Sequence, residues 1–218
     1  MFTKCKIDDL ELVEAVESAS QSWKKSSGHA FEAYIKKTVT DVSSEHKIKF
    51  ILQTDLNKLI KKGSISNDAE DIKWLKTMIA HNVFDLYTIV EDGDRTYCFG
   101  CVQCKTSIRD RNTRDREPSQ KAMERCFWSI VLVLDGDYLK NGKFVAMVNG
   151  GTEEFPDNGW HAMYVLSDDT PADTLPGTVQ RIYHTDIDYE VLVGHSVIAA
   201  KAFTGQGRRL MKKDWKAE

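Results

Sequence analysis

Two strand-forming stretches around a tight turn constrain the fold of this chain more than any other feature. The stretches "VFDLYTIV" (83–90) and "TYCFGCVQCKT" (96–106) are rich in β-branched and aromatic residues, which favour strands. Between them, "EDGD" (91–94) contains the Asp-Gly pair that is typical of a two-residue hairpin turn. The sequence therefore predicts an antiparallel hairpin over 83–106.

The segments after the hairpin predict that it belongs to a larger sheet. Pro118 is expected to open a helix, and "WSIVLVLDG" (128–136) is a nearly continuous apolar run, typical of a strand that is buried on both faces. Three more stretches are expected to be strands: "KFVAMVNGG" (143–151), "WHAMYVLS" (160–167) and "YEVLVG" (189–194). The order of helix, hairpin, helix and buried strand predicts an α/β (α+β) fold with a mixed central β-sheet flanked by helices.

The N-terminal part predicts helices and one short strand. Apolar residues at helical spacing predict a helix over 8–24 and, after the break "KKSSGH" (24–29), a second helix from Ser26 or Ser27 to about Val42. The elements expected next are a strand at 48–53, a short helix at 56–62, and a helix from Asn67 or Asp68 to about His81.

We expect a single domain over 1–218, because no internal repeat and no linker rich in Pro, Gly or Ser interrupts the chain. Within it we distinguish a helical part at about 1–80, a core at about 27–135, and C-terminal strands with a basic tail at about 143–218.

The composition is that of a globular protein, with 41% hydrophobic and 29% charged residues. No apolar run approaches the length of a membrane span. The N-terminal stretch is acidic and amphipathic, unlike a secretion signal, and the five cysteines are an odd number. We therefore expect reduced thiols and a cytoplasmic location.

Three cysteines spaced three apart, Cys98, Cys101 and Cys104, suggest a metal cluster at first. Successive side chains of a strand face opposite ways, so alternation predicts Cys98 and Cys104 on one face and Cys101 on the other. Three ligands divided in this way cannot surround one ion. We therefore expect Cys98 and Cys104 to be small core residues.

The same alternation brings polar side chains together. Gln103 and Lys105 are two residues apart on an otherwise apolar strand, where an unpaired lysine is costly. If the turn at Gly93 pairs the two strands, Asp85 lies close to opposite Gln103. An acid, an amide and an ammonium would then meet at one end of the sheet.

Phosphodiester hydrolysis can use such a set of groups. A carboxylate such as Asp85 binds Mg²⁺, which keeps several waters, polarises a phosphate and lowers the pKa of a bound water. Lys105 would orient that water and offset charge in the transition state. The carbonyl oxygen of Cys104 would be a neutral metal ligand, Glu32 on the preceding helix a second carboxylate, and Gln103 would help to position metal or water.

This arrangement resembles the PD-(D/E)xK nuclease superfamily. In the resemblance, Asp85 is the conserved acid, Gln103-Cys104-Lys105 is the (D/E)xK element and Glu32 is the helical acid. The tract "CKTSIRDR" and the following "PSQKAMERCFWSIVLVLDGD" look most like a type II restriction endonuclease. The resemblance covers about 27–135 and implies a restriction-endonuclease-like core.

Two positions depart from the motif of that superfamily. Phe84 stands where a proline usually precedes Asp85, and Gln103 stands in place of the second acid. The glutamine removes one negative charge from the site, which weakens metal binding unless Glu32 compensates.

The resemblance implies a Mg²⁺-dependent endodeoxyribonuclease that cuts double-stranded DNA, acts as a homodimer on a palindromic site, and has a cognate DNA methyltransferase as a functional partner. Two alternatives stay open: a non-catalytic DNA-binding or assembly subunit that keeps the core as a scaffold, and a transposase-type or repair nuclease. At residue level, the alternative is a partly buried ion pair of Asp85 with Lys105, with Gln103 bonded to the backbone.

Two basic segments stand out in a chain whose formal net charge is −3. Lys105 to Arg125 holds seven basic residues against four acidic ones, and 201–218 holds six against two. The residues expected to contact DNA are Ser107, Arg109, Arg111, Arg114, Arg116, Lys121, Arg125, Arg208 and Arg209. The alternating charges of "IRDRNTRDRE" (108–117) equally allow pairing within the chain, and the tail equally allows a solvated end.

Overall fold

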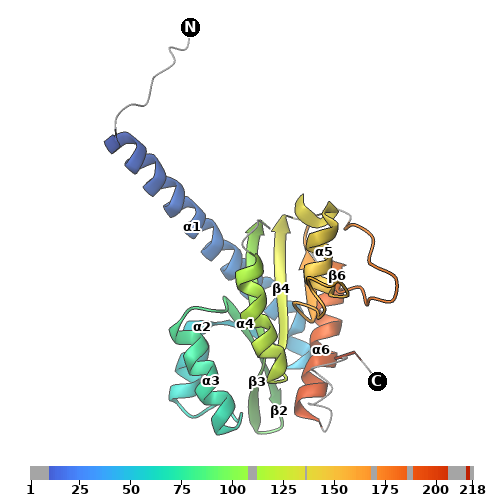
Figure 1. Cartoon of the computed structure of the whole chain (residues 1–218). Coiled ribbons are helices and arrows are strands. Elements are labelled where there is room, and N and C mark those ends of the chain that lie inside the picture. The colour runs from blue at the N-terminus through green and yellow to red at the C-terminus, as the bar shows by residue number, and fades with distance from the viewer. Residues whose placement is uncertain are drawn as a thin grey trace.

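The computed structural model describes residues 10–107, 112–135, 137–167, 171–185, 189–205 and 215–216. Its centre is a six-stranded sheet in the order β1-β2-β3-β4-β5-β6, shown in Figure 1. The strands are β1 (Ile48–Leu52), β2 (Leu86–Asp92), β3 (Arg95–Ser107), β4 (Trp128–Asp135), β5 (Ala162–Val165) and β6 (Ile182–His184). The first three strands pair antiparallel and the last four pair parallel, which confirms the predicted mixed sheet.

Helices pack against both faces of this sheet. They are α1 (Leu10–Ser43), α2 (Gln53–Lys61), α3 (Ala69–Ala80), α4 (Asn112–Glu124), α5 (Gly142–Asn149) and α6 (Glu190–Thr204), with 3₁₀ turns η1 (Ser44–His46) and η2 (Asp137–Lys140). The C-terminal half of α1 packs with α6 against one face, through buried residues such as Ile35, Val39 and Leu192. On the other face, Ser119 of α4 meets Ser129 of β4 with 2.7 Å between their hydroxyl oxygens, and Phe144 of α5 packs in a cluster with Val133.

Four of the predicted elements are different in the structure. Residues 24–29 do not break the N-terminal helix, because α1 is continuous from Leu10 to Ser43. Pro118 lies inside α4, which begins at Asn112. The runs 143–151 and 189–194, predicted as strands, fall on α5 and on the start of α6, because a short apolar run without alternation fits a buried helix as well as a buried strand.

A β-bulge in β3 corrects the predicted arrangement of the cysteines. Thr88 pairs with Gly100 whereas Ile89 pairs with Cys98, so Phe99 is an extra residue in the ladder. Cys98 therefore shares its face with Cys101, and Cys104 lies on the opposite face. The four described cysteines are free thiols, and burial raises the pKa of Cys101 and Cys104 well above its usual value.

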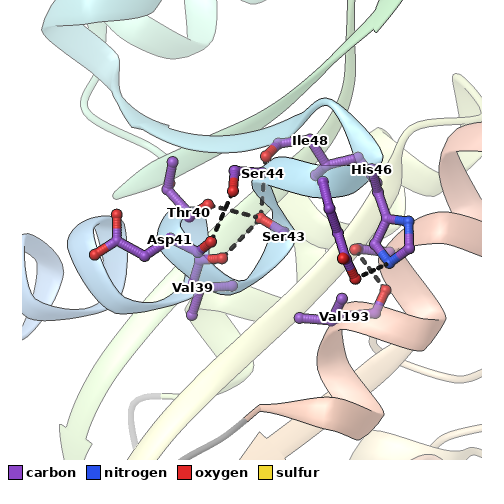
Figure 2. A network of polar contacts seen from close by, with 10 residues as sticks. Val39, Thr40, Asp41, Ser43, Ser44, His46, Ile48 and Val193 are labelled. Atoms are coloured by element: carbon purple, nitrogen blue, oxygen red, sulfur yellow. Dashed lines mark hydrogen bonds and ion pairs between the residues drawn. The ribbon is translucent and has the colours of Figure 1, made fainter.

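The junction between α1 and β1 fixes the helix that carries Glu32. Ser43, the last residue of α1, donates to the carbonyl of Val39 at 2.7 Å and to that of Ile48 in β1 at 3.0 Å, as Figure 2 shows. One turn earlier, the Thr40 hydroxyl accepts from the amide of Phe50 and donates to its carbonyl. These bonds satisfy the outer edge of β1 and hold α1 against the sheet.

Near the end of the chain, Trp215 is 1% exposed and donates its indole N–H to the carbonyl of His161 at 3.1 Å.

The basic residues Arg208 and Arg209, predicted to contact DNA, lie outside the described residues. Among the helices that the structure describes, none combines the length and apolarity that a membrane span needs.

Candidate active site

Asp85 and the end of β3 meet as the hairpin predicts. Leu86 pairs with Val102, and the amide of Asp85 donates to the Val102 carbonyl at 3.0 Å, so Asp85 comes opposite Gln103. One carboxylate oxygen of Asp85 accepts from the amide of Cys104 at 2.7 Å. This bond fixes the carboxylate beside the Gln103-Cys104-Lys105 element.

The carboxyl group of Asp85 is mostly buried, and burial raises its pKa to about 6. The hydrogen bond from Cys104 and the charge of Lys105 lower the pKa, but the negative charges of Glu32 and Asp115 raise it again. Asp85 thus lies within the electrostatic reach of two other carboxylates as well as of Lys105. A cation at this point would relieve the repulsion.

Glu32, predicted as a second carboxylate of the site, lies on α1. Its neighbours Phe31 and Ile35 are buried, which turns this side of the helix toward the sheet. The Glu32 carboxylate is partly buried and pairs with His29 at 3.3 Å. Because its charge acts on both Asp85 and Cys104, it is a second carboxylate near the end of β3.

Asp115 is a site residue that the sequence analysis missed. Its carboxylate lies 3.0 Å from the Lys105 ammonium, with side-chain exposures of 27% and 29%. Lys105 therefore pairs with Asp115 in the described structure, and its effect on Asp85 is through its charge. Asp115 stands in the segment of alternating charges before Pro118, where no sequence pattern distinguished it from its neighbours.

The side chain of Gln103 points into the protein. It is 1% exposed, its amide oxygen accepts from the Trp160 indole N–H at 2.8 Å, and its amide nitrogen donates to the backbone carbonyl of Asp115 at 3.1 Å. The amide of Gln103 is thus bonded to two segments that pack on β3. Asp115 lies on α4, and Trp160 lies just before β5. The alternative stated above had Gln103 hydrogen-bonded to the backbone, and the structure contains such a bond, to the Asp115 carbonyl.

A metal ion implied by the resemblance fits part of this donor set. Within the described ranges, no three His, Cys, Asp or Glu side chains form a group that could hold an ion by themselves. Two carboxylates, Asp85 and Glu32, with the carbonyl oxygen of Cys104 would supply oxygen ligands and leave positions for water. Mg²⁺ prefers such a set, because it binds through one or two carboxylates and keeps several waters.

The residues predicted to contact DNA have mixed surroundings. Arg114 is exposed, but Arg116 is directed inward, with its guanidinium bonded to the carbonyls of Met147 and Asp157. Lys121 pairs with Glu117 at 2.6 Å on the surface of α4, and the Arg125 guanidinium lies 5.8 Å from the centre of the Trp74 ring. Arg109, Arg111 and the side chain of Ser107 lie outside the described residues.

A groove rich in lysine lies between α1, β1 and α2. Its volume is about 530 Å³, and its lining includes Lys36, Lys37, Lys49, Lys58 and Lys62 against two acids, Asp41 and Asp55. Lys36 follows Glu32 by one helical turn and pairs with Asp55 at 2.6 Å. Lys37 and Lys62 are exposed. The lining of the groove therefore has an excess of positive charge, and it begins one turn of α1 after Glu32.

Comparison with solved structures gives two informative matches. A restriction endonuclease described as a pre-specific BsaWI-DNA complex is 50% identical over 98% of this chain and 76% of its own, with a TM-score of 0.87. A specific AgeI-DNA complex is 18% identical over 83% of this chain and 69% of its own, with a TM-score of 0.56, which supports the fold alone. No match was found among the curated proteins.

The model of the family described as BsaWI restriction endonuclease type 2 matches residues 64–191, more than half of the chain. The matched residues include Asp85, Gln103, Lys105 and Asp115, and the predicted restriction-endonuclease-like fold is confirmed. The chain therefore belongs to the BsaWI family of type II restriction endonucleases.

Proposed function

We propose that this protein is a Mg²⁺-dependent enzyme that cuts both strands of double-stranded DNA at a specific sequence. The observation that carries the proposal is the meeting of Asp85, Glu32 and the Lys105–Asp115 pair at the end of β3. The fold and family support a nuclease, and the two matched structures are DNA complexes of their own enzymes.

In this proposal Asp85, Glu32 and the Cys104 carbonyl hold Mg²⁺. The bound ion supplies polarisation of a phosphate oxygen and a lower pKa for a bound water. Lys105, whose ammonium is held by Asp115, orients the attacking water and offsets the negative charge that grows on the phosphate. The water oxygen bonds to phosphorus and one P–O ester bond breaks, which leaves a phosphate and a hydroxyl at the two ends.

The DNA backbone would extend from this site into the lysine groove. Phosphate contacts from lysine and arginine position a duplex without reading its sequence. The groove begins one turn of α1 away from Glu32, so Lys37 and Lys62 suit phosphates next to the one that is cut. Arg114, exposed at the start of α4, suits the opposite side of the site.

We further infer a homodimer on a palindromic site, because two-fold symmetry of the protein then matches that of the DNA. The host would need a DNA methyltransferase that protects the same site, and enzyme and DNA would meet in the cytoplasm. A non-catalytic DNA-binding subunit is the second candidate, favoured by one observation: the position of the usual second acid holds Gln103, whose amide is engaged inside the protein.

Digestion of plasmid DNA separates the two candidates. The enzyme is expected to give discrete fragments with Mg²⁺ and none with EDTA, and Lys105→Ala is expected to bind DNA without cutting it. Binding by the wild-type protein, with no cleavage under any divalent ion, would favour the subunit.

A further inference from the structure

The amide of Gln103 joins three elements around the proposed site. Gln103 lies on β3, its acceptor Asp115 lies on α4, and its donor Trp160 lies just before β5. Trp160 is itself fixed, since it is 1% exposed and its carbonyl accepts from Asn158 at 2.7 Å. A buried, fully bonded amide of this kind holds its partners in one arrangement.

The hydrogen-bond pattern requires an amide at this position. The side chain must accept from the Trp160 indole and donate to the Asp115 carbonyl at the same time. A glutamate has no proton to donate when ionised, so one of its oxygens would face the carbonyl oxygen of Asp115. It would also be a charge at a position that is 1% exposed.

The bond to Asp115 connects Gln103 to Lys105. The backbone of Asp115 is held by Gln103, and the carboxylate of the same residue lies 3.0 Å from the Lys105 ammonium. The amide therefore determines where Asp115 stands and, through it, where Lys105 points.

We propose that Gln103 is a positioning residue and not a metal ligand: its amide clamps α4 to β3, so that Asp115 holds the Lys105 ammonium at the proposed site. The proposal rests on the proposed nuclease function. It replaces the role that the motif assigns to this position, and it explains why a glutamine stands where related nucleases have an acid.

Two substitutions at Gln103 distinguish a clamp from a ligand. Gln103→Glu restores the acid of the motif, so a ligand role predicts tighter Mn²⁺ binding and equal or faster cleavage. The clamp predicts the opposite, a kcat lowered at least about tenfold, because a small misplacement of a catalytic group can cost about 100-fold. Gln103→Met, which cannot form either bond, is expected to lower kcat in the same way.

Metal affinity provides the second readout. Titration of the protein alone with Mn²⁺ is expected to give the wild-type Kd for Gln103→Met, and the KM for duplex DNA is expected to stay unchanged. Trp160→Phe keeps an aromatic ring but loses the indole donor and part of the ring volume, and it is expected to lower kcat in the same direction, by less, also without a change in Mn²⁺ affinity.

A matched control separates positioning from loss of stability. Asn67 makes the same kind of bonds at the other end of β3, where it donates to the Cys98 carbonyl at 2.9 Å and accepts from its amide at 2.8 Å. Asn67→Leu is expected to lower the melting temperature about as much as Gln103→Met does, with kcat unchanged.

Three outcomes would overturn the inference while the wild-type enzyme still cuts DNA. They are a Gln103→Glu variant that cuts at least as fast as wild type, a Gln103→Met variant whose Kd for Mn²⁺ rises about tenfold or more, and an Asn67→Leu variant whose kcat falls in proportion to its stability. A wild-type protein that cuts no DNA would instead overturn the proposed function, and this inference with it.

Discussion

At the scale of the residue, the Asp85 carboxylate is held where its ionised form is costly. Burial and two neighbouring carboxylates raise its pKa to about 6. Raised pKa values of this kind gather at functional sites. The neighbouring charges of Glu32 and Asp115, which disfavour a further anion, also favour the binding of a cation. Asp85 should therefore lower the stability of the free protein and be needed for its activity.

Asp85→Asn is expected to stabilise the protein at pH 8 and to abolish cleavage. The folded pKa, about 6, is above the usual value of 3.8, so Asp85 favours the folded state below pH 3.8 and loses that contribution as the pH rises through about 6. At pH 8 the ionised group costs about 2 kcal/mol, at roughly 1.4 kcal/mol per pKa unit with a discount for relaxation. Asparagine keeps an acceptor for the Cys104 amide.

Urea unfolding of both proteins without metal, at pH 8 and at pH 3.5, measures this effect. The gain in unfolding free energy should be present at pH 8 and absent at the lower pH. Equal stability of the two proteins at pH 8 would show that Asp85 is not strained in the folded state.

Cleavage is expected to depend on pH and Mg²⁺ together. At low Mg²⁺ the rate should fall about tenfold per pH unit below about 6, because protonated Asp85 does not bind the ion. Higher Mg²⁺ should move the midpoint to lower pH, since the ion competes with the proton. Rates measured from pH 5 to 8 at several Mg²⁺ concentrations test this, and a midpoint independent of Mg²⁺ would contradict it.

At the scale of the element, the hairpin was predictable and its surroundings were less so. The turn at Gly93 predicted that Asp85 comes close to opposite Gln103, because local turn chemistry sets the register. The register next to the turn would place Asp85 opposite Val102, and the extra residue of the bulge brings it opposite Gln103. The bulge at Phe99 was not predictable, because it depends on a close contact: a Cβ at Gly100 would lie 2.3 Å from the Thr88 hydroxyl and 2.8 Å from the Trp128 carbonyl.

Two residues that bond to the site, Asp115 and Trp160, lie in parts of the chain that no sequence pattern links to Lys105 or Gln103. Asp115 follows Lys105 by ten residues and Trp160 follows Gln103 by 57, so their contacts arise only when α4 and the segment before β5 pack on β3. The helices α5 and α6 were mistaken for strands for a related reason. Burial of every residue from Phe144 to Asn149 removes the periodicity in α5, and the run 189–194 at the start of α6 is too short to show one.

The lysine groove between α1, β1 and α2 gives a prediction at this scale. Lys37→Ala with Lys62→Ala is expected to weaken binding of any duplex and to lower the slope of log Kd against log salt by about two, near one per phosphate contact. Binding in Ca²⁺ at several salt concentrations measures this slope. Lys73→Ala with Lys76→Ala, on exposed positions of α3, is the control and should leave the slope unchanged. An equal change in both pairs would exclude the groove.

At the scale of the whole molecule, the sheet brings parts of the chain that are distant in sequence to one end. Glu32 comes from α1, Asp85 from the residue just before β2, Lys105 from the end of β3 and Asp115 from α4. One such site cuts one strand, so cleavage of both strands at a specific sequence calls for two copies related by two-fold symmetry.

The mass of the complex with a duplex that contains the cut site tests this symmetry. Light scattering is expected to show two protein chains per duplex in Ca²⁺, and one cut on each strand at symmetric positions in Mg²⁺. One chain per duplex with a cut on a single strand would contradict the homodimer.

In the function proposed above, Asp85 and Lys105 form a hydrolytic site for DNA. The most direct test is the mapping of fragment ends after digestion of a sequenced plasmid with Mg²⁺, with wild type and Lys105→Ala compared at equal DNA occupancy. Wild type is expected to give ends at one recurring sequence, and the variant is expected to cut at a rate at least about 100-fold lower. Equal cleavage by the two proteins, or ends scattered without a common sequence, would contradict it.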